Sequence, residues 1–513
     1  MLGSGKQSGR MLQSTIIVTI FLVVGQGIGF ITQVVIASAF GARADMDAFL
    51  AAVTLPQYII AVLLNSLNFA FIPIAINYLA KGREEEARQL TSTVVNLSFL
   101  VLGIIAVGGI VFAEPLLRLT TPGLTPASLH LASKVAMITW PTIVATGLIS
   151  LLTALYQARN YFSWPAAVPV IGGLINLGLV LWLAASWGVT GLALAATCSA
   201  VVQVVLLFFT GVGRSHYRLY FNWRHPGVRE VIRLALPLIV SGLLVRWTPV
   251  MDRYLASNLP EGSISHLGYA FKLISVLAPL VSTGFSVVIF PKMALEACEA
   301  NLANLKDTIS QSLRLIWLVV APVIVLGGVL AGPLVTLVFM RGKFTAGDAL
   351  AVAGLLQVYL LSMVGSCLGS ITGRSFYALK DTRTISIMGI VEALAYVVYT
   401  PFLAHRFGAL GIAWGFVIYY NLSVFWQVFL IRYKTGKTGG RTVIKSFART
   451  ILAAVAAGAV TWGFLFLISG LPQKIMIGGS LGLAVYLVLL YAIGSPELRI
   501  IWDRVVAGRR FTS

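Results

Sequence analysis

Charged residues are scarce in this chain. Only 11% of its 513 residues are Asp, Glu, Lys or Arg, against about 25% in an ordinary soluble domain. This scarcity excludes a soluble globular protein of such length, because its surface could not be covered with polar groups. Cysteine is also rare, and the sequence spacing of Cys198, Cys298 and Cys367 fits no metal-ligand pattern. The sequence therefore predicts neither a disulfide framework nor a metal site.

Acidic residues are the rarer of the two charge signs, with 17 Asp and Glu against 37 Lys and Arg and a net charge of +20. A basic balance can indicate nucleic-acid binding, but here the cations fall between apolar runs, as in the loops of membrane proteins. The sequence contains no G-x-x-x-x-G-K-[ST] phosphate-binding motif, and its loops are too short for an ATPase domain. We therefore expect no nucleic-acid partner, no bound cofactor and no enzymatic activity.

Apolar residues, in contrast, make up 58% of the chain and occur in long runs. Runs such as 101–112 and 481–493 lie in windows that can cross roughly 30 Å of hydrocarbon, which takes about 20 residues as a helix. The run that begins at Ile16 is too long for a signal peptide. Because the runs are continuous rather than alternating, they indicate helices and not barrel strands. The predicted fold class is an all-α polytopic membrane protein with about 14 transmembrane helices.

The loops between the spans differ in charge. Loops on one side carry roughly four times as many cations as loops on the other, which places both termini in the cytoplasm by the positive-inside rule. The cation-rich loops include Lys81, Arg224, Arg432 and Arg441. We expect a multi-pass protein of the bacterial cytoplasmic membrane.

An internal repeat divides the chain. LYQARNYFSW (155–164) and WGVTGLALA (187–195) resemble FYALKDTRTI (376–385) and FGALGIAWG (407–415), and Gly188 corresponds to Gly408 at an offset of 220 residues. Two copies of a six-helix unit would insert in the same orientation, as parallel lobes around a central cavity. Transporters of this kind bind substrate near the midplane and alternate access by rocking. The predicted domains are an N-lobe at 1–215, a C-lobe at 228–432, an appended helix pair at 446–494 and a cytoplasmic tail at 495–513.

Three motifs narrow the class of transporter. FGARADMDAFLAAVTLP (40–56), TPGL (121–124) and RGKFTAGDA (341–349) resemble motifs of the MviN/MurJ-like family of the MOP flippase superfamily. The resemblance implies a flippase that moves a polyprenyl-diphosphate-linked glycan across the membrane by alternating access. Lipid II or a related cell-wall or exopolysaccharide precursor would be the cargo, membrane lipids would be the other partners, and the protein would act as a monomer.

The chain departs from this family where lipid II flippases carry arginines in the N-lobe. Here the first span has Gln26 and then Thr32 and Gln33, and the second span has Ile60 and Ala61. The family's ADRL motif in the eighth span reads AFKL here, which leaves Lys272 as the one cation of this motif. These departures favour a lipid-linked saccharide other than lipid II.

Charged residues within spans are costly and usually functional. Guanidinium groups bind phosphate oxygens in a bidentate way, so we predict a diphosphate-binding cavity. Its predicted residues are Arg246, Lys272, Arg253, Arg374 and Gln26. The alternatives are that Asp252 pairs with a nearby arginine for assembly, that Arg253 reaches to the interface, and that Arg374 is a positive-inside anchor.

A second set of residues is predicted to act in ion coupling or gating: Asp47, Asp252 and Glu392. Asp47 could instead be an N-cap of the second span, and Glu392 could bond to a neighbouring helix. The driving force is left open between Na+, H+ and the membrane potential. Proline bends long helices, so the predicted hinges are Pro56, Pro73, Pro279 and Pro291.

Two other functions remain open. A drug or metabolite antiporter on the same scaffold would need a carboxylate-rich cavity, whereas the candidate residues here are mostly basic. A non-transporting membrane scaffold in cell-wall synthesis is compatible with the missing N-lobe arginines.

Overall fold

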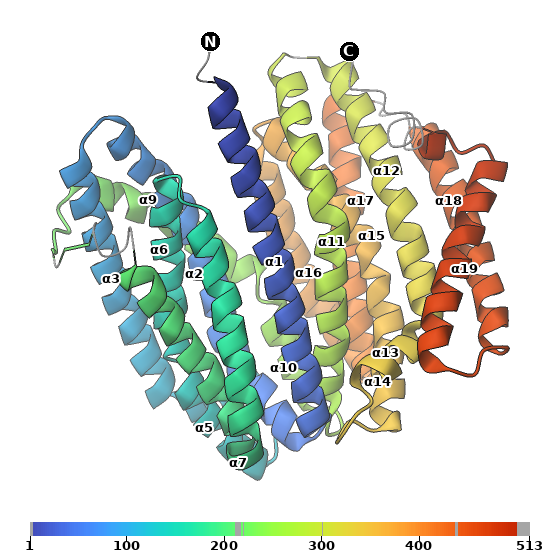
Figure 1. Cartoon of the computed structure of the whole chain (residues 1–513), viewed down its shortest axis with the longest axis horizontal. Coiled ribbons are helices and arrows are strands. Elements are labelled where there is room, and N and C mark those ends of the chain that lie inside the picture. The colour runs from blue at the N-terminus through green and yellow to red at the C-terminus, as the bar shows by residue number, and fades with distance from the viewer. Residues whose placement is uncertain (1–3, 211–216, 219, 300, 437–439, 500–513) are drawn as a thin grey trace. The chain divides into compact units, whose positions relative to one another are not determined.

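The structure is a computed structural model that describes residues 4–210, 217–218, 220–299, 301–436 and 440–499 (Figure 1). Within these ranges every regular element is a helix. This confirms the predicted all-α class. Residues 500–513 of the predicted cytoplasmic tail lie outside the described residues.

The first copy of the repeat comprises seven helices. They are α1 (Ser4–Phe40), α2 (Ala44–Ala80), α3 (Glu84–Val111), α4 (Ala113–Thr120), α5 (Pro126–Thr139), α6 (Thr142–Ala158) and α7 (Ser163–Phe209). The second copy follows the same order with nine helices. They are α9 (Pro226–Val245), α10 (Thr248–Ser257), α11 (Ser263–Cys298), α12 (Leu302–Val329), α13 (Ala331–Phe339), α14 (Ala346–Leu360), α15 (Ser362–Ala378), α16 (Thr382–Phe407) and α17 (Ala409–Thr435).

The two copies agree in helix length and in backbone geometry. Both α3 and α12 have 28 residues, and both α6 and α15 have 17. Gly188 interrupts α7 with φ 57° and ψ −140°, and Gly408 separates α16 from α17 with φ 60° and ψ −136°. The repeat seen in the sequence is therefore a repeat of structure, helix by helix.

Local capping chemistry repeats as well. Thr125 accepts a hydrogen bond from the backbone N–H of Ser128 and begins α5, and Thr345 accepts one from the N–H of Asp348 and begins α14. Such caps satisfy backbone donors that have no partner within the helix. The start of α5 and the start of α14 thus have the same physical cause.

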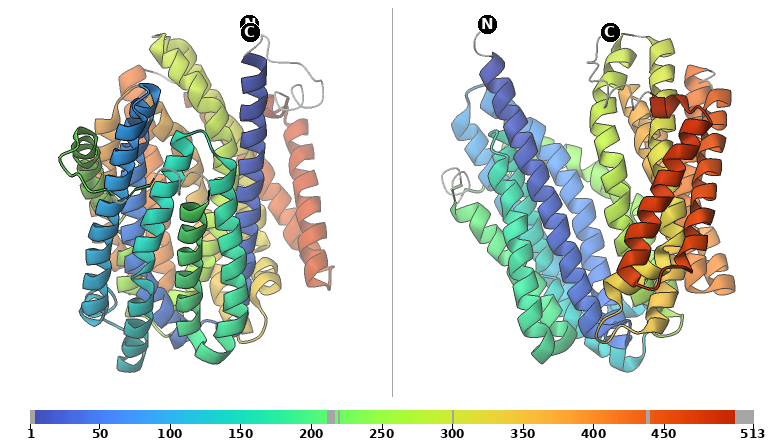
Figure 2. Two further views of the ribbon diagram at one scale, coloured as in Figure 1. Left: turned by 60° about the vertical axis from the view of Figure 1, so that its left-hand side comes forward. Right: turned by 45° about the vertical axis from the view of Figure 1, so that its right-hand side comes forward.

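The last two helices, α18 (Gly440–Leu465) and α19 (Leu471–Ala492), pack against α12, as Figure 2 shows. The Tyr486 hydroxyl on α19 donates a hydrogen bond of 2.7 Å to the Leu318 carbonyl, and the rings of Trp317 and Phe447 stack at 4.7 Å. Beyond α19, Glu497 accepts a hydrogen bond from the Arg314 guanidinium at 2.7 Å. The appended pair is therefore anchored to the second copy, with α18 against α12 and α19 against both α12 and α13.

Twelve of the described helical segments are long and apolar enough to cross a membrane. The difference from the expected fourteen has two causes. The spans expected on either side of Gly188 are both present, but they count as one segment, Ser163–Phe209, in which the non-helical backbone at Gly188 separates two helices. The seventh expected span is divided into α9 and α10, and α9 carries Arg229, Glu230 and Arg233 near its start.

By their contacts, the helices form two compact units. One comprises Met1–Ser265 with Arg341–Phe344, and the other His266–Met340 with Thr345–Ser513. Helices α9 and α10 pack with the first unit, where α9 lies against α2 and α3. The predicted lobes follow the repeat rather than these contacts, and their boundaries remain a prediction.

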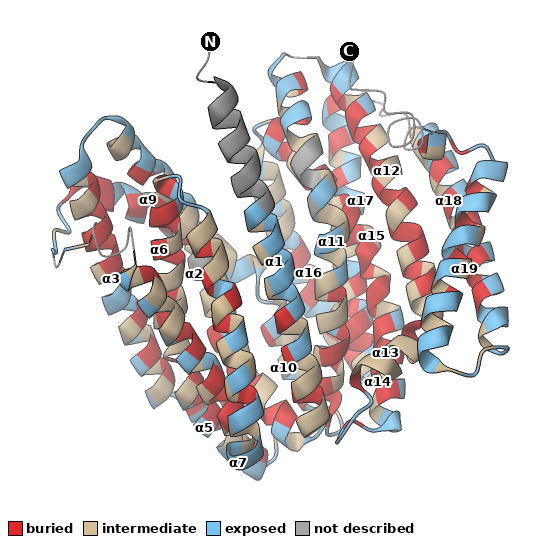
Figure 3. Cartoon of the chain, in the orientation of Figure 1, coloured by how far each residue is buried: buried red, intermediate tan, exposed pale blue. Residues whose placement is uncertain are grey.

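The interior of the first unit is apolar. A buried cluster that includes Phe71, Leu90 and Val228 joins α2, α3, α6 and α9 (Figure 3). On its outer surface α3 exposes Phe99, Leu100 and Ile104. Exposed apolar surface of this kind is stable beside lipid, whereas water would disfavour it.

The buried ion pair between Arg314 and Glu497 gives a stability prediction. We expect Glu497→Gln to reduce the free energy of unfolding by about 3–5 kcal/mol, because it leaves the Arg314 charge buried without an anionic partner. Thermal unfolding in detergent measures the loss. In the control Glu114→Gln the cation that remains, Arg118, is also 2.7 Å from the replaced carboxylate, but both side chains are about half exposed or more. That control should lose less than about 1 kcal/mol, and equal losses would contradict the prediction.

The same ion pair should depend on pH. Burial raises the pKa of Glu497, but hydrogen bonds from its own backbone N–H and from Ser495 and the charge of Arg314 outweigh burial, so the pKa lies below the ordinary 4.5. A carboxyl with a lowered pKa stabilises the fold above its ordinary value, and the stabilisation is lost as pH falls through the lowered pKa. The stability difference between wild type and Glu497→Gln should therefore disappear on acidification.

Candidate functional site

The three motifs singled out in the sequence meet in one part of the first compact unit. Residues 38–47, 121–125, 253–265 and 341–344 lie there and contact one another through hydrogen bonds. We call these residues the motif cluster.

Within the motif cluster, each copy of the repeat donates a backbone hydrogen bond to the other. The backbone N–H of Lys343, in the second copy, donates a hydrogen bond of 2.8 Å to the Ser38 carbonyl at the end of α1. The backbone N–H of Gly123, in the first copy, donates one of 3.2 Å to the Ser257 hydroxyl at the end of α10. Because Ser38 and Ser257 end corresponding helices, the two contacts are reciprocal.

Gly41 and Gly342 make this approach possible. Their φ angles are +64° and +58°, which disfavour any residue with a Cβ atom. A Cβ on Gly41 would lie 2.5 Å from the Lys343 carbonyl oxygen, and a Cβ on Gly342 would lie 2.2 Å from that of Ser38. The glycines of the FGA and GKF motifs are therefore required by the packing of two backbones.

Asp47 is the buried carboxylate of the motif cluster, with 5% of its surface exposed. It accepts hydrogen bonds of 2.7 Å from the backbone N–H groups of Gly262 and Ser265, and a third from the Ser265 hydroxyl. These donors lie at the start of α11, whereas α2 begins at Arg43 without a side-chain cap. The expectation that Asp47 caps the second span is therefore wrong: it caps the eighth.

Arg253 also belongs to the motif cluster. Its guanidinium donates a hydrogen bond of 2.8 Å to the Ile264 carbonyl, and its charge acts on Asp47. Asp252 is half-buried beside it. These contacts place Arg253 in a structural role at the motif cluster, and its predicted role toward a diphosphate remains a prediction.

Arg246 has a different environment. It follows the last residue of α9, where the helix breaks before α10, and its backbone N–H bonds to the Gly242 carbonyl. The side chain is exposed, and no ion pair to it occurs among the described residues. Its guanidinium is free to bind an anion.

Lys272 and Arg374 lie in the second unit. Lys272 is half-buried on α11, next to the aromatic contact between Phe271 and Phe416. The Arg374 guanidinium carbon lies 5.7 Å from the centre of the Phe290 ring, a cation–π geometry. Both remain predicted binding residues.

The N-lobe positions that lack arginine supply no charge. Gln26 is exposed on α1, and the Thr32 hydroxyl donates a hydrogen bond to the Ile28 carbonyl within its own helix. Gln33, Ile60 and Ala61 are half-buried.

The predicted hinge prolines lie inside helices that continue through them. Pro56 and Pro73 lie within the 37 residues of α2, and Pro279 and Pro291 lie within the 36 residues of α11. Whether these helices bend there during function remains a prediction.

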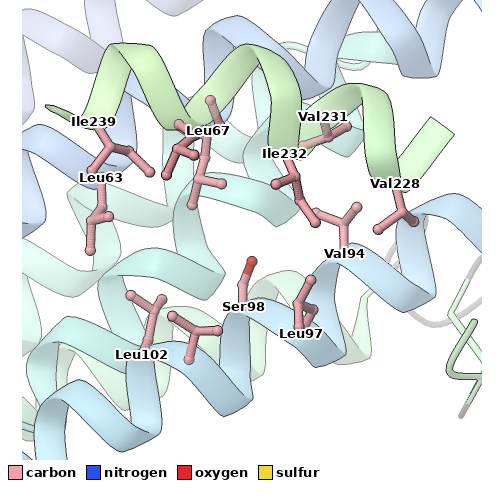
Figure 4. A pocket seen from close by; sticks show the side chains of 13 residues that line it. Leu63, Leu67, Val94, Leu97, Ser98, Leu102, Val228, Val231, Ile232 and Ile239 are labelled. Atoms are coloured by element: carbon pink, nitrogen blue, oxygen red, sulfur yellow. The ribbon is translucent and has the colours of Figure 1, made fainter. Parts of the chain in front are cut away.

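The first unit also contains an apolar cavity of about 140 Å³ between α2, α3 and α9 (Figure 4). Leu67, Leu97 and Ile232 are among its thirteen lining residues, of which Ser98 is the one polar member. A cavity without a cation cannot offset the desolvation of a diphosphate. It fits hydrocarbon rather than a headgroup.

Several residues of the motif cluster had not been predicted from the sequence. Ser257, Gly262 and Ser265 bond to the first copy, and the Glu261 carboxylate accepts a hydrogen bond of 2.9 Å from the backbone N–H of Ala44. The repeat held a usable signal, since Ser257 and Gly262 correspond to Ser38 and Gly41.

Comparison with known proteins agrees with this architecture. The family described as "Lipid II flippase MurJ" matches residues 36–479. Among relatives, a probable lipid II flippase MurJ of Vibrio cholerae is 26% identical over 95% of this chain and 97% of its own. One of Synechocystis is 27% identical over 98% of each chain.

Solved structures share the fold. A lipid II flippase MurJ in an inward closed conformation covers 96% of this chain and all of its own, with a TM-score of 0.81 and 21% identity. An inward-facing multidrug resistance MATE family transporter of the MOP superfamily covers 82% of this chain and 98% of its own, with a TM-score of 0.69 and 17% identity.

The repeated helix pattern and these likenesses define the fold of a MOP-superfamily transporter, a multi-pass membrane protein. Within that superfamily, the family match spans most of the chain and includes all three motifs of the motif cluster. The chain belongs to the MurJ family.

The role of Asp47 can be tested by stability. We expect Asp47→Asn to lower the free energy of unfolding by about 2–3 kcal/mol, because an amide keeps one acceptor oxygen and turns an NH₂ group toward backbone donors. Asp45, exposed in the same first turn of α2, provides the control Asp45→Asn. Both variants remove one negative charge near the helix start. Equal melting temperatures of the two variants in detergent would show that the bonds to α11 contribute little.

Proposed function

We propose that this chain is a flippase that moves a polyprenyl-diphosphate-linked glycan across the cytoplasmic membrane by alternating access. The headgroup and its diphosphate bind cations within the protein, and the prenyl chain stays in lipid. Membership of the MurJ family supports the reaction class. The family relatives named above are lipid II flippases or probable ones, and the cargo here is lipid II or a related precursor.

The observation that carries this proposal is the free guanidinium of Arg246. Arg246 lies at the break between α9 and α10, within the seventh expected span, where it is exposed and without an ion pair among the described residues. A cation at membrane depth is costly unless it binds an anion. The planar donors of the Arg246 guanidinium match two phosphate oxygens. The other members of the proposed binding set are Lys272, Arg374, Arg253 and Gln26.

The motif cluster is the proposed gate. Asp47 and its bonds to Gly262 and Ser265 hold the ends of α2 and α11 together, and release of these bonds opens the site on that face. Bending at Pro56, Pro73, Pro279 and Pro291 accompanies the change. An ion gradient or the membrane potential drives it, with Asp252 and Glu392 as further candidate coupling residues.

The remaining parts of the proposal follow from the charge pattern and the family. The protein acts as a monomer, without enzymatic activity and without a nucleic-acid partner, and both termini are cytoplasmic. Its likeness to MATE transporters concerns the fold, and the basic candidate residues disfavour export of cationic drugs. A non-transporting scaffold is distinguished by the transport assay below.

Arg246 is tested by transport. In reconstituted vesicles we expect Arg246→Ala to slow the flipping of lipid II or a related polyprenyl-diphosphate-linked saccharide at least about tenfold, equal to about 1.4 kcal/mol. Arg246→Lys should recover part of the rate, because an ammonium group lacks the bidentate fork.

Arg229, at the other end of α9 and also exposed, supplies the matched control Arg229→Ala. That variant should transport at the wild-type rate. Normal transport by a folded Arg246→Ala protein would place the anion site elsewhere. Absence of transport by the wild type with any such lipid would favour the scaffold.

Orientation is tested by cysteine labelling. In a background where Cys198, Cys298 and Cys367 are alanine, Ala127→Cys and Glu85→Cys each place one exposed thiol on opposite ends of the first unit's helices. A membrane-impermeant maleimide should label residue 127 in intact cells and residue 85 only after permeabilisation. The reverse pattern would place the termini outside.

A further inference from the structure

Glu392 is a buried carboxylate in the middle of a membrane helix. It lies ten residues after Thr382, the first residue of α16, and 7% of its surface is exposed. At 1.5 Å per residue this is about 15 Å into the helix, about half of the roughly 30 Å hydrocarbon core. An ionised carboxylate at such a depth is costly unless it gains a proton or a cation.

The Glu392 carboxyl lacks a full set of hydrogen-bond partners. The Ser423 hydroxyl on α17 is a neighbour that acts on it, and its Oε1 atom has no partner among the described residues. Ser423 in turn accepts a hydrogen bond of 3.0 Å from the Gln427 side-chain amide, whose oxygen accepts one from the Thr372 hydroxyl. Thr372 and Gln427 are also buried.

These groups lie in sequence beside the carboxyl. Thr372 donates to Gln427 and Gln427 donates to Ser423, and Ser423 is the neighbour of Glu392. Glu392, Tyr396 and Thr400 are four residues apart on one buried face of α16, and the Thr400 hydroxyl has no hydrogen-bond partner among the described residues. Polar groups therefore lie on both sides of Glu392.

The first copy of the repeat shows that packing does not require this carboxylate. At the same offset of 220 residues, Glu392 corresponds to Gly172 and Ser423 corresponds to Gln203. There the Gln203 side chain lies over Gly172, so that a Cβ on Gly172 would be 2.4 Å from its amide. In the first copy the neutral amide of Gln203 thus fills the space above Gly172. In the second copy the corresponding space is filled from the opposite side, by the carboxylate of Glu392.

The site fits a proton better than a metal ion. Hard cations bind several oxygen ligands, whereas the Gln427 and Ser423 oxygens are already engaged and Glu392 supplies one free oxygen. Among the residues that the structure describes, no group of three His, Cys, Asp or Glu side chains could hold a metal.

Helices α15 and α17 pack against α16, and their charged side chains lie toward helix ends. On the three helices and their caps these are Arg374, Asp381, Arg383, His405, Arg406, Arg432 and Lys434. Burial and Ser423 act on the Glu392 carboxyl, and among described residues no charged group does. A proton is therefore the available means of neutralising it.

We propose that Glu392 is a proton-binding site in the second copy of the repeat, beside the polar side chains of Ser423, Gln427 and Thr372, and that its proton couples transport to a pH gradient. The coupling part rests on the proposed function. The proton binds to the carboxylate in one conformation of the transporter and leaves it in another.

The experiment measures proton binding and transport separately. Infrared difference spectra of the protein in lipid vesicles, recorded across a pH step, report the carbonyl band of a protonated carboxylic acid. We expect Glu392→Gln to remove one such band. The double variant Glu392→Gly with Ser423→Gln, which copies the arrangement of Gly172 and Gln203, should remove it while preserving the packing.

Transport of lipid-linked cargo in the same vesicles should rise several-fold in the wild type when a pH gradient is imposed, and should not respond in either variant. Glu296→Gln is the matched control. Glu296 is equally buried and has an unpartnered Oε2, but Lys292 lies 3.9 Å away and supplies a cation. That control should keep the pH response and the band assigned to Glu392.

An unchanged band in a folded Glu392→Gln protein would overturn the proton site, whatever the transport result. If the band is lost but the pH response of transport persists, the coupling is overturned. Failure of the wild type to move any lipid-linked cargo would contradict the proposed function and also the coupling, while the infrared result would still decide the proton site.

Discussion

The bilayer core offers no hydrogen-bond partners to the chain, and the rest of this structure depends on that constraint. Backbone groups must be satisfied within the protein, which is why the described elements are helices. Buried polar side chains likewise need hydrogen-bond partners within the protein. A buried polar group persists only where the protein supplies its partner, as Gly262 and Ser265 do for Asp47, or where function tolerates the cost.

Duplication supplies many of these partners. Because the two copies repeat helix by helix, a helix end in one copy meets a loop in the other. Lys343 binds the Ser38 carbonyl, and Gly123 binds the Ser257 hydroxyl. The family motifs supply the residues that permit these hydrogen bonds between the copies. They place glycines where two backbones meet, and Asp47 where a helix start needs an acceptor.

The sequence was sufficient for the helical class, the repeat and the appended pair, because long apolar runs and an offset of 220 residues are properties of the linear chain. It did not predict that Arg253 would bond to the Ile264 carbonyl, or that Asp47 would cap α11 instead of α2. Asp47 and Gly262 are 215 residues apart, and nothing local in either segment specifies their contact. Nor could spacing predict that α9 packs with the first compact unit while the repeat assigns it to the second copy.

The differences between the two copies are more informative about function than their agreement. Asp47 and His266 are each the fourth residue of corresponding helices, α2 and α11. Asp47 accepts hydrogen bonds at the start of a helix, whereas His266 lies 2.9 Å from the Asp348 carboxylate. Gln203 over Gly172 and Glu392 beside Ser423 also differ, since a neutral amide in the first copy is replaced by an ionisable group in the second. Packing of the repeat is satisfied by the neutral pair, so the carboxylate of the second copy needs another explanation than packing.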